Sequence, residues 1–151
     1  MSEFLKNSKA RRDYRILETF EAGVVLKGTE VKSLRAGKGQ IRDAYVKIEN
    51  GEAWLHNAHI EEYSHGNLLN HKPKAARKLL LHRKEIRQLF ELGSIKGHTL
   101  VPLSFHWKKG KVKVLVGAGR GKDQKDKRET IKQRDSDREL KRATMQHLKR
   151  K

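Results

Sequence analysis

The chain has 151 residues, enough for one domain with a hydrophobic core or for a smaller domain followed by a tail. Its 36 Lys and Arg outnumber its 18 Asp and Glu, so the net charge is +18. We therefore expect a cytoplasmic protein that binds a polyanion, and we favour nucleic acid over an anionic membrane as that partner. No run approaches the roughly 20 apolar residues of a membrane span, the N-terminus lacks the apolar segment of a signal peptide, and the absence of cysteine excludes disulfides and thiolate metal sites.

The N-terminal part is predicted to pass from a mobile segment into a strand. Residues 1–12 are polar and basic, and we expect them to be mobile unless a partner orders them. From Tyr14, apolar residues at even spacing predict a half-buried strand. Residues 21–26 continue it as a second strand or a bent extension, in which Gly23 suits a bulge.

A short helix is predicted over residues 29–36. Thr29 is the expected N-cap, and Gly37 fits just past the end. Val31 and Leu34 are three residues apart, so we expect both to face the core.

Residues 43–60 predict a β-hairpin. Apolar and polar residues alternate up to Glu49, and Asn50-Gly51 is the residue pair that favours a type I′ turn. The return strand runs from Glu52 to Ile60.

Residues 61–77 are polar and predict a long exposed loop of the kind that often carries function. Residues 79–81 are three leucines, consistent with a buried strand or with the approach to a helix. A helix is predicted over residues 83–92, ended by Gly93. Its core-facing residues, by their spacing, are Ile86, Leu89 and Phe90.

Residues 99–107 and 111–118 predict a second hairpin, because apolar residues alternate along both. Pro102 indicates that part of the first strand lies at a sheet edge. The sum is about six short strands and two or three helices, and a closed antiparallel barrel accounts for them because closure removes strand edges.

We predict two domains, a barrel over residues 1–119 and a basic tail over residues 120–151. The tail holds 13 Lys/Arg and 6 Asp/Glu, a net charge of 13 − 6 = +7. Its few apolar side chains cannot offset the entropy of ordering it, although its composition favours helix, so we expect it to be unstructured alone and helical on a partner. Three glycines, Gly117, Gly119 and Gly121, suggest a swivel where the tail leaves the barrel.

Catalytic chemistry is not indicated. The glycines just named lack the spacing of a dinucleotide or phosphate-binding loop. His56 and His59 would point to opposite faces of a strand, which disfavours a metal site. No acids or serines form a recognisable catalytic pattern, so we expect a binding protein, not an enzyme, with no cofactor.

RNA binding is favoured by the basic charge together with flat side chains suited to stacking on unpaired bases. Core packing is the competing interpretation, and we prefer it for Phe105 and Trp107. The flat side chains are Tyr14, Tyr45, Trp54, His82 and Trp107.

Several blocks resemble the small protein B (SmpB) family, the tmRNA-binding proteins of bacterial trans-translation. They lie in order over nearly the whole chain and read NSKARRDY (7–14), FEAG (20–23), LKGTEVKSLRAGK (26–38), RKLLL (77–81), LVPL (100–103) and GKDQKDKR (121–128).

The resemblance implies an oligonucleotide-binding (OB)-like barrel that binds the tRNA-like domain of tmRNA (SsrA RNA) in place of the missing anticodon arm. It implies that the tail becomes helical in the decoding centre and empty mRNA channel of the small ribosomal subunit, as a codon–anticodon mimic. It also implies delivery to stalled ribosomes with elongation factor Tu, peptide tagging and ribosome rescue. We expect a monomer.

The resemblance also implies functional residues. Those expected to bind tmRNA are Asn7, Lys9, Arg11, Tyr14, Glu21, Lys32, Arg35, Lys38, Lys78, Leu80, His82 and Lys113. Those expected to bind the ribosome are Arg120, Gly121, Lys122, Lys125, Asp126, Lys127, Arg128, Lys132 and Arg134.

Two positions depart from the family pattern. His82 stands where many members have Asn, and it can still stack or donate a hydrogen bond. Lys125 stands where some members have His, so a phosphate contact is more natural there than stacking. Two alternatives are a general ribosomal or RNA-chaperone protein and, less favoured, an RNA-processing enzyme.

Overall fold

The computed structural model of the chain describes residues 2–66 and 70–122. Met1–Gly121 form one compact unit, and of the residues beyond it only Lys122 is described. The domain boundary at residue 119 and the character of the tail therefore stay predictions. No helix among the described residues is long and apolar enough to cross a membrane.

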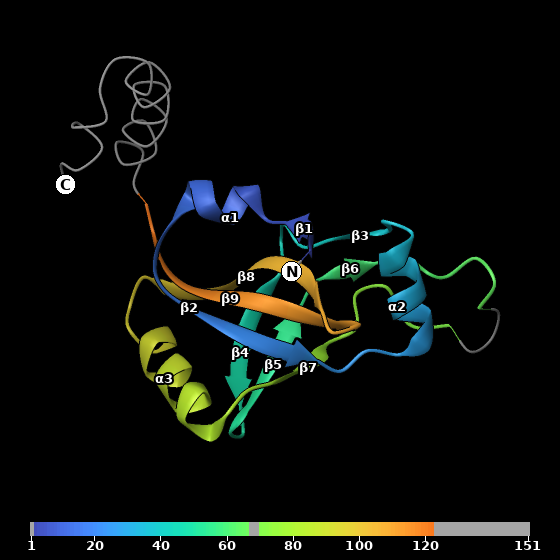
Figure 1. The fold of residues 1–151 in the computed structure, drawn as a ribbon. Coiled ribbons are helices and arrows are strands. Elements are labelled where there is room, and N and C mark those ends of the chain that lie inside the picture. Colours follow the sequence, from blue (N-terminus) through green and yellow to red (C-terminus); the bar gives the residue numbers. More distant parts are fainter. Residues whose placement is uncertain (1, 67–69, 123–151) are drawn as a thin grey trace, which may run out of the picture. The chain divides into compact units, whose positions relative to one another are not determined.

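Six antiparallel strands form a closed barrel (Figure 1). Neighbours follow the order β8-β4-β5-β7-β2-β9, and β9 pairs back with β8 to close the ring. The predicted mainly-β barrel is confirmed, with three helices around it. The strands are β2 (Tyr14–Val24), β4 (Tyr45–Glu49), β5 (Glu52–His56), β7 (Arg77–Leu80), β8 (His98–Lys108) and β9 (Lys111–Gly121). A separate two-stranded sheet pairs β3 (Gly39–Gln40) with β6 (His59–Ile60).

Both predicted hairpins are present, and each turns through two residues with positive φ. The return strand of the first was predicted to reach Ile60 but ends at His56, and His59–Ile60 pair with β3 in the separate sheet. Asn50 and Gly51 join β4 to β5 with φ of 51° and 74°, as a type I′ turn requires. Lys109 and Gly110 join β8 to β9 with φ of 52° and 77°. Residues 79 and 80 lie in β7, so the leucine run belongs mainly to a strand.

The bulge predicted at Gly23 lies elsewhere. Gly23 pairs in register with Leu80 and Lys113, whereas the β2–β9 register shifts between Ile16 and Glu18. Glycine at position 23 instead permits a close approach of β7, because a Cβ there would lie 3.3 Å from the Leu80 Cβ.

Pro102 does not lie at a sheet edge, as the sequence had suggested. It is fully buried opposite Val116 of β9, beside a register shift between Pro102 and Ser104. A strand interior tolerates proline at such a bulge, because the missing N–H need not interrupt a regular ladder.

Helix α2 (Gly28–Arg35) begins one residue earlier than predicted, and Lys27 is its N-cap. The Lys27 N–H donates to Glu30 Oε1 at 2.7 Å, which satisfies one end of the helix start. Thr29, the predicted cap, instead shares a hydrogen bond of 2.9 Å between its hydroxyl and His71 Nδ1.

Helix α3 (Arg83–Gly93) matches its predicted range but not its predicted core face. Leu89 is fully buried and Ile86 is half-buried, whereas Phe90 is 58% exposed. The spacing rule placed all three residues on the core face, but of the three only Leu89 is fully buried against the barrel.

The prediction that residues 1–12 are mobile is wrong. Strand β1 (Ser2–Lys6) pairs with β8, and helix α1 (Ser8–Asp13) follows it. Asn7 lies between them, where its Oδ1 accepts from the Ala10 N–H at 3.1 Å as a helix cap. The segment is ordered by pairing and capping, which a polar composition does not reveal.

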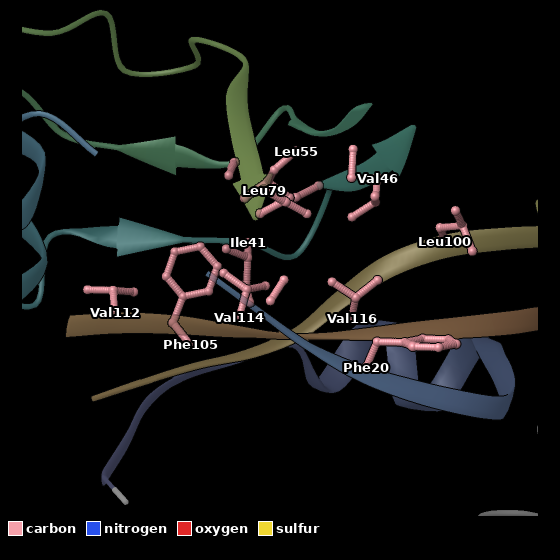
Figure 2. Packing of buried hydrophobic residues seen from close by; sticks show 14 of the residues in the cluster. Phe20, Ile41, Val46, Leu55, Leu79, Leu100, Phe105, Val112, Val114 and Val116 are labelled. Atoms are coloured by element: carbon pink, nitrogen blue, oxygen red, sulfur yellow. The ribbon is translucent and has the colours of Figure 1, made fainter. Parts of the chain in front are cut away.

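The hydrophobic core fills the barrel, and Figure 2 shows its side chains converging from strands on all sides. Phe105, as predicted, is fully buried in it. A smaller cluster under α1 contains Ala10, Val101 and Leu103. The barrel is therefore a rigid support for the side chains on its outer surface.

Candidate nucleic-acid interface

Helix α2 is held against the barrel by a buried ion pair. Arg77 Nε donates to Glu30 Oε2, and each residue is 3% exposed. The same guanidinium donates to two backbone carbonyls at 2.6 and 3.0 Å. Because Glu30 faces inward, the solvent side of α2 presents Lys32 and Arg35, which are both exposed.

Both of these α2 cations lie over aromatic rings. The Arg35 guanidinium lies 5.5 Å from the centroid of Trp107, and Lys32 Nζ lies 5.4 Å from the centroid of Tyr63. Trp107 stacks on Phe4 of β1 with centroids 4.9 Å apart and planes inclined by 24°. Trp107 is half-buried, so it combines the core packing that we preferred with a surface role.

The crossing of β7, β2 and β9 continues this face. Leu80 is 53% exposed and, with Lys113, pairs with the central Gly23. These three residues and Trp107 line one hollow of about 260 Å³. The fold thus brings Leu80 and Lys113, two predicted residues 33 positions apart, together with the aromatic ring over which Arg35 lies.

Glu21 makes its polar contacts within the protein. Its carboxylate accepts from Lys108 Nζ at 3.0 Å and lies 3.3 Å from His106 Nε2. The hydrogen bond from Lys108 is the main cause that lowers the pKa of Glu21 below its usual range, against a smaller effect of burial. Through this hydrogen bond the carboxylate positions a basic neighbour, Lys108.

Lys38 lies just beyond α2 and is exposed. The adjoining hollow of about 450 Å³ is also lined by Glu61 and Glu62. Two carboxylates make this part of the surface less favourable to phosphate than the face around Lys113.

The N-terminal candidates are one buried residue and three residues that are exposed or half-buried. Asn7 is 1% exposed, and its Nδ2 donates to two backbone carbonyls at 3.0 and 2.9 Å. The Asn7 amide is thus occupied by hydrogen bonds inside the protein, and its contact with RNA stays a prediction. Lys9 pairs with Asp43 at 2.9 Å, Arg11 is exposed, and Tyr14 is half-buried. The hydrogen bond from Lys9 lowers the pKa of Asp43.

Two further candidates lie near the start of α3. Lys78 forms an ion pair with Glu52 at the surface. His82 is the N-cap of α3, is exposed, and its backbone N–H donates to Glu85 Oε1 at 3.1 Å. Among the described residues, neither Lys78 nor His82 makes a side-chain hydrogen bond or ion pair with Leu80, Trp107 or Lys113.

The tail candidates begin inside β9. Arg120 and Gly121 end the strand and are exposed, and Lys122 follows. Lys125, Asp126, Lys127, Arg128, Lys132 and Arg134 lie outside the described residues. The glycines before them do not form a swivel, because Gly117 and Gly119 are buried and paired on both sides, with β2 and with β8.

Sequence reasoning missed the residues that support the interface. Arg77 stands in a block that resembles the family, but nothing in the sequence pairs it with Glu30 across 47 positions. Tyr63 lies in a loop that we called functional without naming a residue. Among the described residues, no group of three His, Asp or Glu side chains could hold a metal ion.

Comparison with known proteins gives a consistent result. A family model described as "SmpB protein" matches residues 4–146. The SsrA-binding protein of Halalkalibacterium halodurans is 54% identical over 138 residues, which cover 91% of this chain and 90% of the relative. The SsrA-binding protein of Bacillus subtilis is 52% identical over 138 residues, covering 91% and 88%. A solved structure described as "tmRNA-SmpB: a journey to the center of the bacterial ribosome" superimposes with a TM-score of 0.69 at 46% identity, covering 87% of this chain and 95% of the other.

Proposed function

The chain belongs to the SmpB protein family, and from this premise we propose that it binds tmRNA and acts with it in trans-translation on the ribosome. The proposal extends to this chain what the names of its relatives and of the similar structure state. In this proposal the protein acts by binding RNA and does not catalyse a reaction.

The observation that carries the proposal is the convergence of Arg35, Leu80 and Lys113 on one face of the barrel. They come from α2, β7 and β9, and they surround Trp107 and Gly23. Such a face offers cations for phosphate and flat or apolar surface for a base or ribose, the combination that recognises folded RNA. We infer that it binds the tRNA-like domain.

A second region of contact with tmRNA is proposed on α1 and at the start of β2, formed by Lys9, Arg11 and Tyr14. Contacts that flank the first face are proposed for Lys32, Lys38, Lys78 and His82. Glu21 and Asn7 are proposed to act through their neighbours, Glu21 by holding Lys108 and Asn7 by anchoring α1.

The tail, from Arg120 onward, is proposed to occupy the decoding centre and the empty mRNA channel of the small subunit as a codon–anticodon mimic. Its charge, +7 over 32 residues, suits a path lined by ribosomal RNA. The same proposal includes how the protein acts. It is delivered as a monomer together with elongation factor Tu, it acts in the cytoplasm, and its action leads to peptide tagging and ribosome rescue.

Substitution of the converging face is the test. Lys113→Gln should weaken tmRNA binding and reduce the slope of log affinity against log salt by about one, because one phosphate contact is lost. Lys96→Gln, at an exposed position that does not line this hollow, is the matched control. Equal slopes for both variants would remove Lys113 from the phosphate contacts.

Truncation after Gly121 tests the division between barrel and tail. It should leave tmRNA affinity nearly unchanged and abolish peptide tagging in a reconstituted translation assay. Loss of tmRNA binding in the truncated chain would contradict the division. Competition between tmRNA and bulk tRNA separates this proposal from a general RNA chaperone, which would bind the two comparably.

A further inference from the structure

An exposed aromatic ring on α3 lies outside the surface discussed so far. Phe90 is 58% exposed, the highest value among the described large apolar residues. Its neighbour Leu89 already fixes α3 to the barrel. Packing of the barrel therefore does not require a large ring at position 90.

Two grooves meet at this ring. One, of about 460 Å³, runs between α3 and the β4–β5 turn and includes Arg83 and Arg87. The other, of about 340 Å³, runs between α3, β4 and β8 and includes Tyr45 and Lys47. Both are lined by Phe90 and Ile48, so the two grooves adjoin at these residues. We call them together the α3 groove (Tyr45, Lys47, Ile48, Arg83, Arg87 and Phe90).

The charge of the α3 groove has one sign. Lys47, Arg83 and Arg87 line it, and no carboxylate is among the described lining residues. None of the three cations makes an ion pair with another described residue, unlike Lys9, Lys78 and Lys108 elsewhere on the barrel. Tyr45, 43% exposed, adds a second accessible ring.

Exposed aromatic rings in a basic groove without acids are the features with which proteins bind single-stranded nucleic acid, because bases stack on the rings and phosphates meet the cations. Each groove has a volume in the range of small-ligand sites, about 300–1,000 Å³. The site thus fits a few consecutive unpaired nucleotides.

We propose that the α3 groove binds an unpaired segment of ribosomal RNA, with a base stacked on Phe90 and its flanking phosphates on Arg83 and Arg87. This inference rests on the proposed function, which requires the protein to hold two RNA partners at once. Helices α2 and α3 lie at different sides of the barrel (Figure 1). His82, a proposed flanking contact of tmRNA, caps the start of α3, so tmRNA bound around α2 reaches at most the Arg83 end of the α3 groove and leaves the part around Phe90 open to the second partner.

Substitutions at Phe90 distinguish a base from a peptide side chain as the occupant. Phe90→Tyr keeps the ring, and Phe90→Leu keeps only the apolar character. If a base stacks there, Phe90→Leu should weaken binding of the protein–tmRNA complex to purified ribosomes at least about fivefold, whereas Phe90→Tyr should bind like the parent protein. A fluorescent oligouridine of about 12 nucleotides should respond to the two variants in the same order.

Charge is tested separately. Arg87→Gln should lower the salt slope for oligouridine binding by about one, and Lys84→Gln, on α3 but outside the groove, should not. Because Phe90 and Arg87 are exposed, these variants should keep the parent melting temperature, which is measured first.

Three outcomes would overturn the inference: ribosome binding unchanged by Phe90→Leu, equal loss with Phe90→Tyr and Phe90→Leu, or a matching loss of tmRNA affinity. A peptide occupant would show as retained binding with Phe90→Leu. Failure of the parent protein to prefer tmRNA over bulk tRNA would instead contradict the proposed function, and the oligouridine measurement would still report on the groove.

Discussion

Arg77→Met is expected to cost much of the stability of the barrel unit. The substitution keeps an apolar chain of similar length but leaves the Glu30 carboxylate buried without its cation, at 3% exposure of the residue. It also removes the donors to two backbone carbonyls at 2.6 and 3.0 Å. Removing one partner of a buried ion pair typically costs about 3–5 kcal/mol, a large share of the roughly 5–15 kcal/mol that stabilises a domain.

Urea unfolding followed by tryptophan fluorescence measures this cost. The midpoint should fall while the dependence on urea stays constant, because the surface exposed on unfolding is unchanged. The double variant Glu30→Gln/Arg77→Met should recover at least half of the loss, since it no longer buries a lone charge and the glutamine oxygen can still accept from the Lys27 N–H.

The functional consequence follows from the position of α2. At a temperature where Arg77→Met remains folded, tmRNA affinity should still fall, because Lys32 and Arg35 lose their fixed support. A loss of stability under about 1 kcal/mol, or a double variant whose loss equals the sum of the two single losses, would refute the coupling on which this reasoning depends.

Three other predictions concern packing, protonation and anchoring. Gly119→Ala should destabilise the protein by about 1–3 kcal/mol, because the added Cβ would lie 2.9 Å from the Cβ of Tyr14. Gly121→Ala is the control: its added Cβ would have no atom within 4 Å, so the same urea titration should show little effect. Because the pKa of Glu21 is lowered in the folded protein, its ionised carboxylate stabilises the fold at neutral pH, and this contribution is lost as the pH falls below about 4.3 through the folded-state pKa. Lys108→Met removes the main cause of the lowered pKa, so its unfolding free energy should decrease less between pH 7 and pH 3 than that of the parent protein. Asn7→Ala should cost about 2–4 kcal/mol by leaving two buried carbonyls unpaired, and its tmRNA affinity, measured on folded protein, should fall less than that of Lys113→Gln; an equal fall would restore Asn7 to the contact residues.

The barrel could be predicted because its strands are local patterns. Alternation along residues 43–60 and the Asn50-Gly51 turn determine a hairpin whatever surrounds it, and β4–β5 appears where expected. The N-terminal segment could not be predicted in the same way. Its order depends on pairing with β8 about 100 positions away and on the buried contacts of Asn7 with Ile41 and Pro102.

The candidate site was predictable only as a set of residues. The family resemblance named Arg35, Leu80 and Lys113, but their convergence around Trp107 depends on the closure of the ring through β7, β2 and β9. The α3 groove was hidden for a different reason. Helical spacing assigned Phe90 to the core, and only the position of α3 against β4 and β8 turns that ring outward.

Strand β9 gives the exit of the tail a mechanical property. Its residues pair with β2 up to Gly121 and with β8 up to Arg120, and side chains pack against Gly117 and Gly119. The backbone of β9 is therefore held by both neighbouring strands as far as Arg120, and the described residues of β9 before it contain no flexible joint. A rotation of the barrel would therefore turn Arg120, at the end of this paired strand, by the same angle.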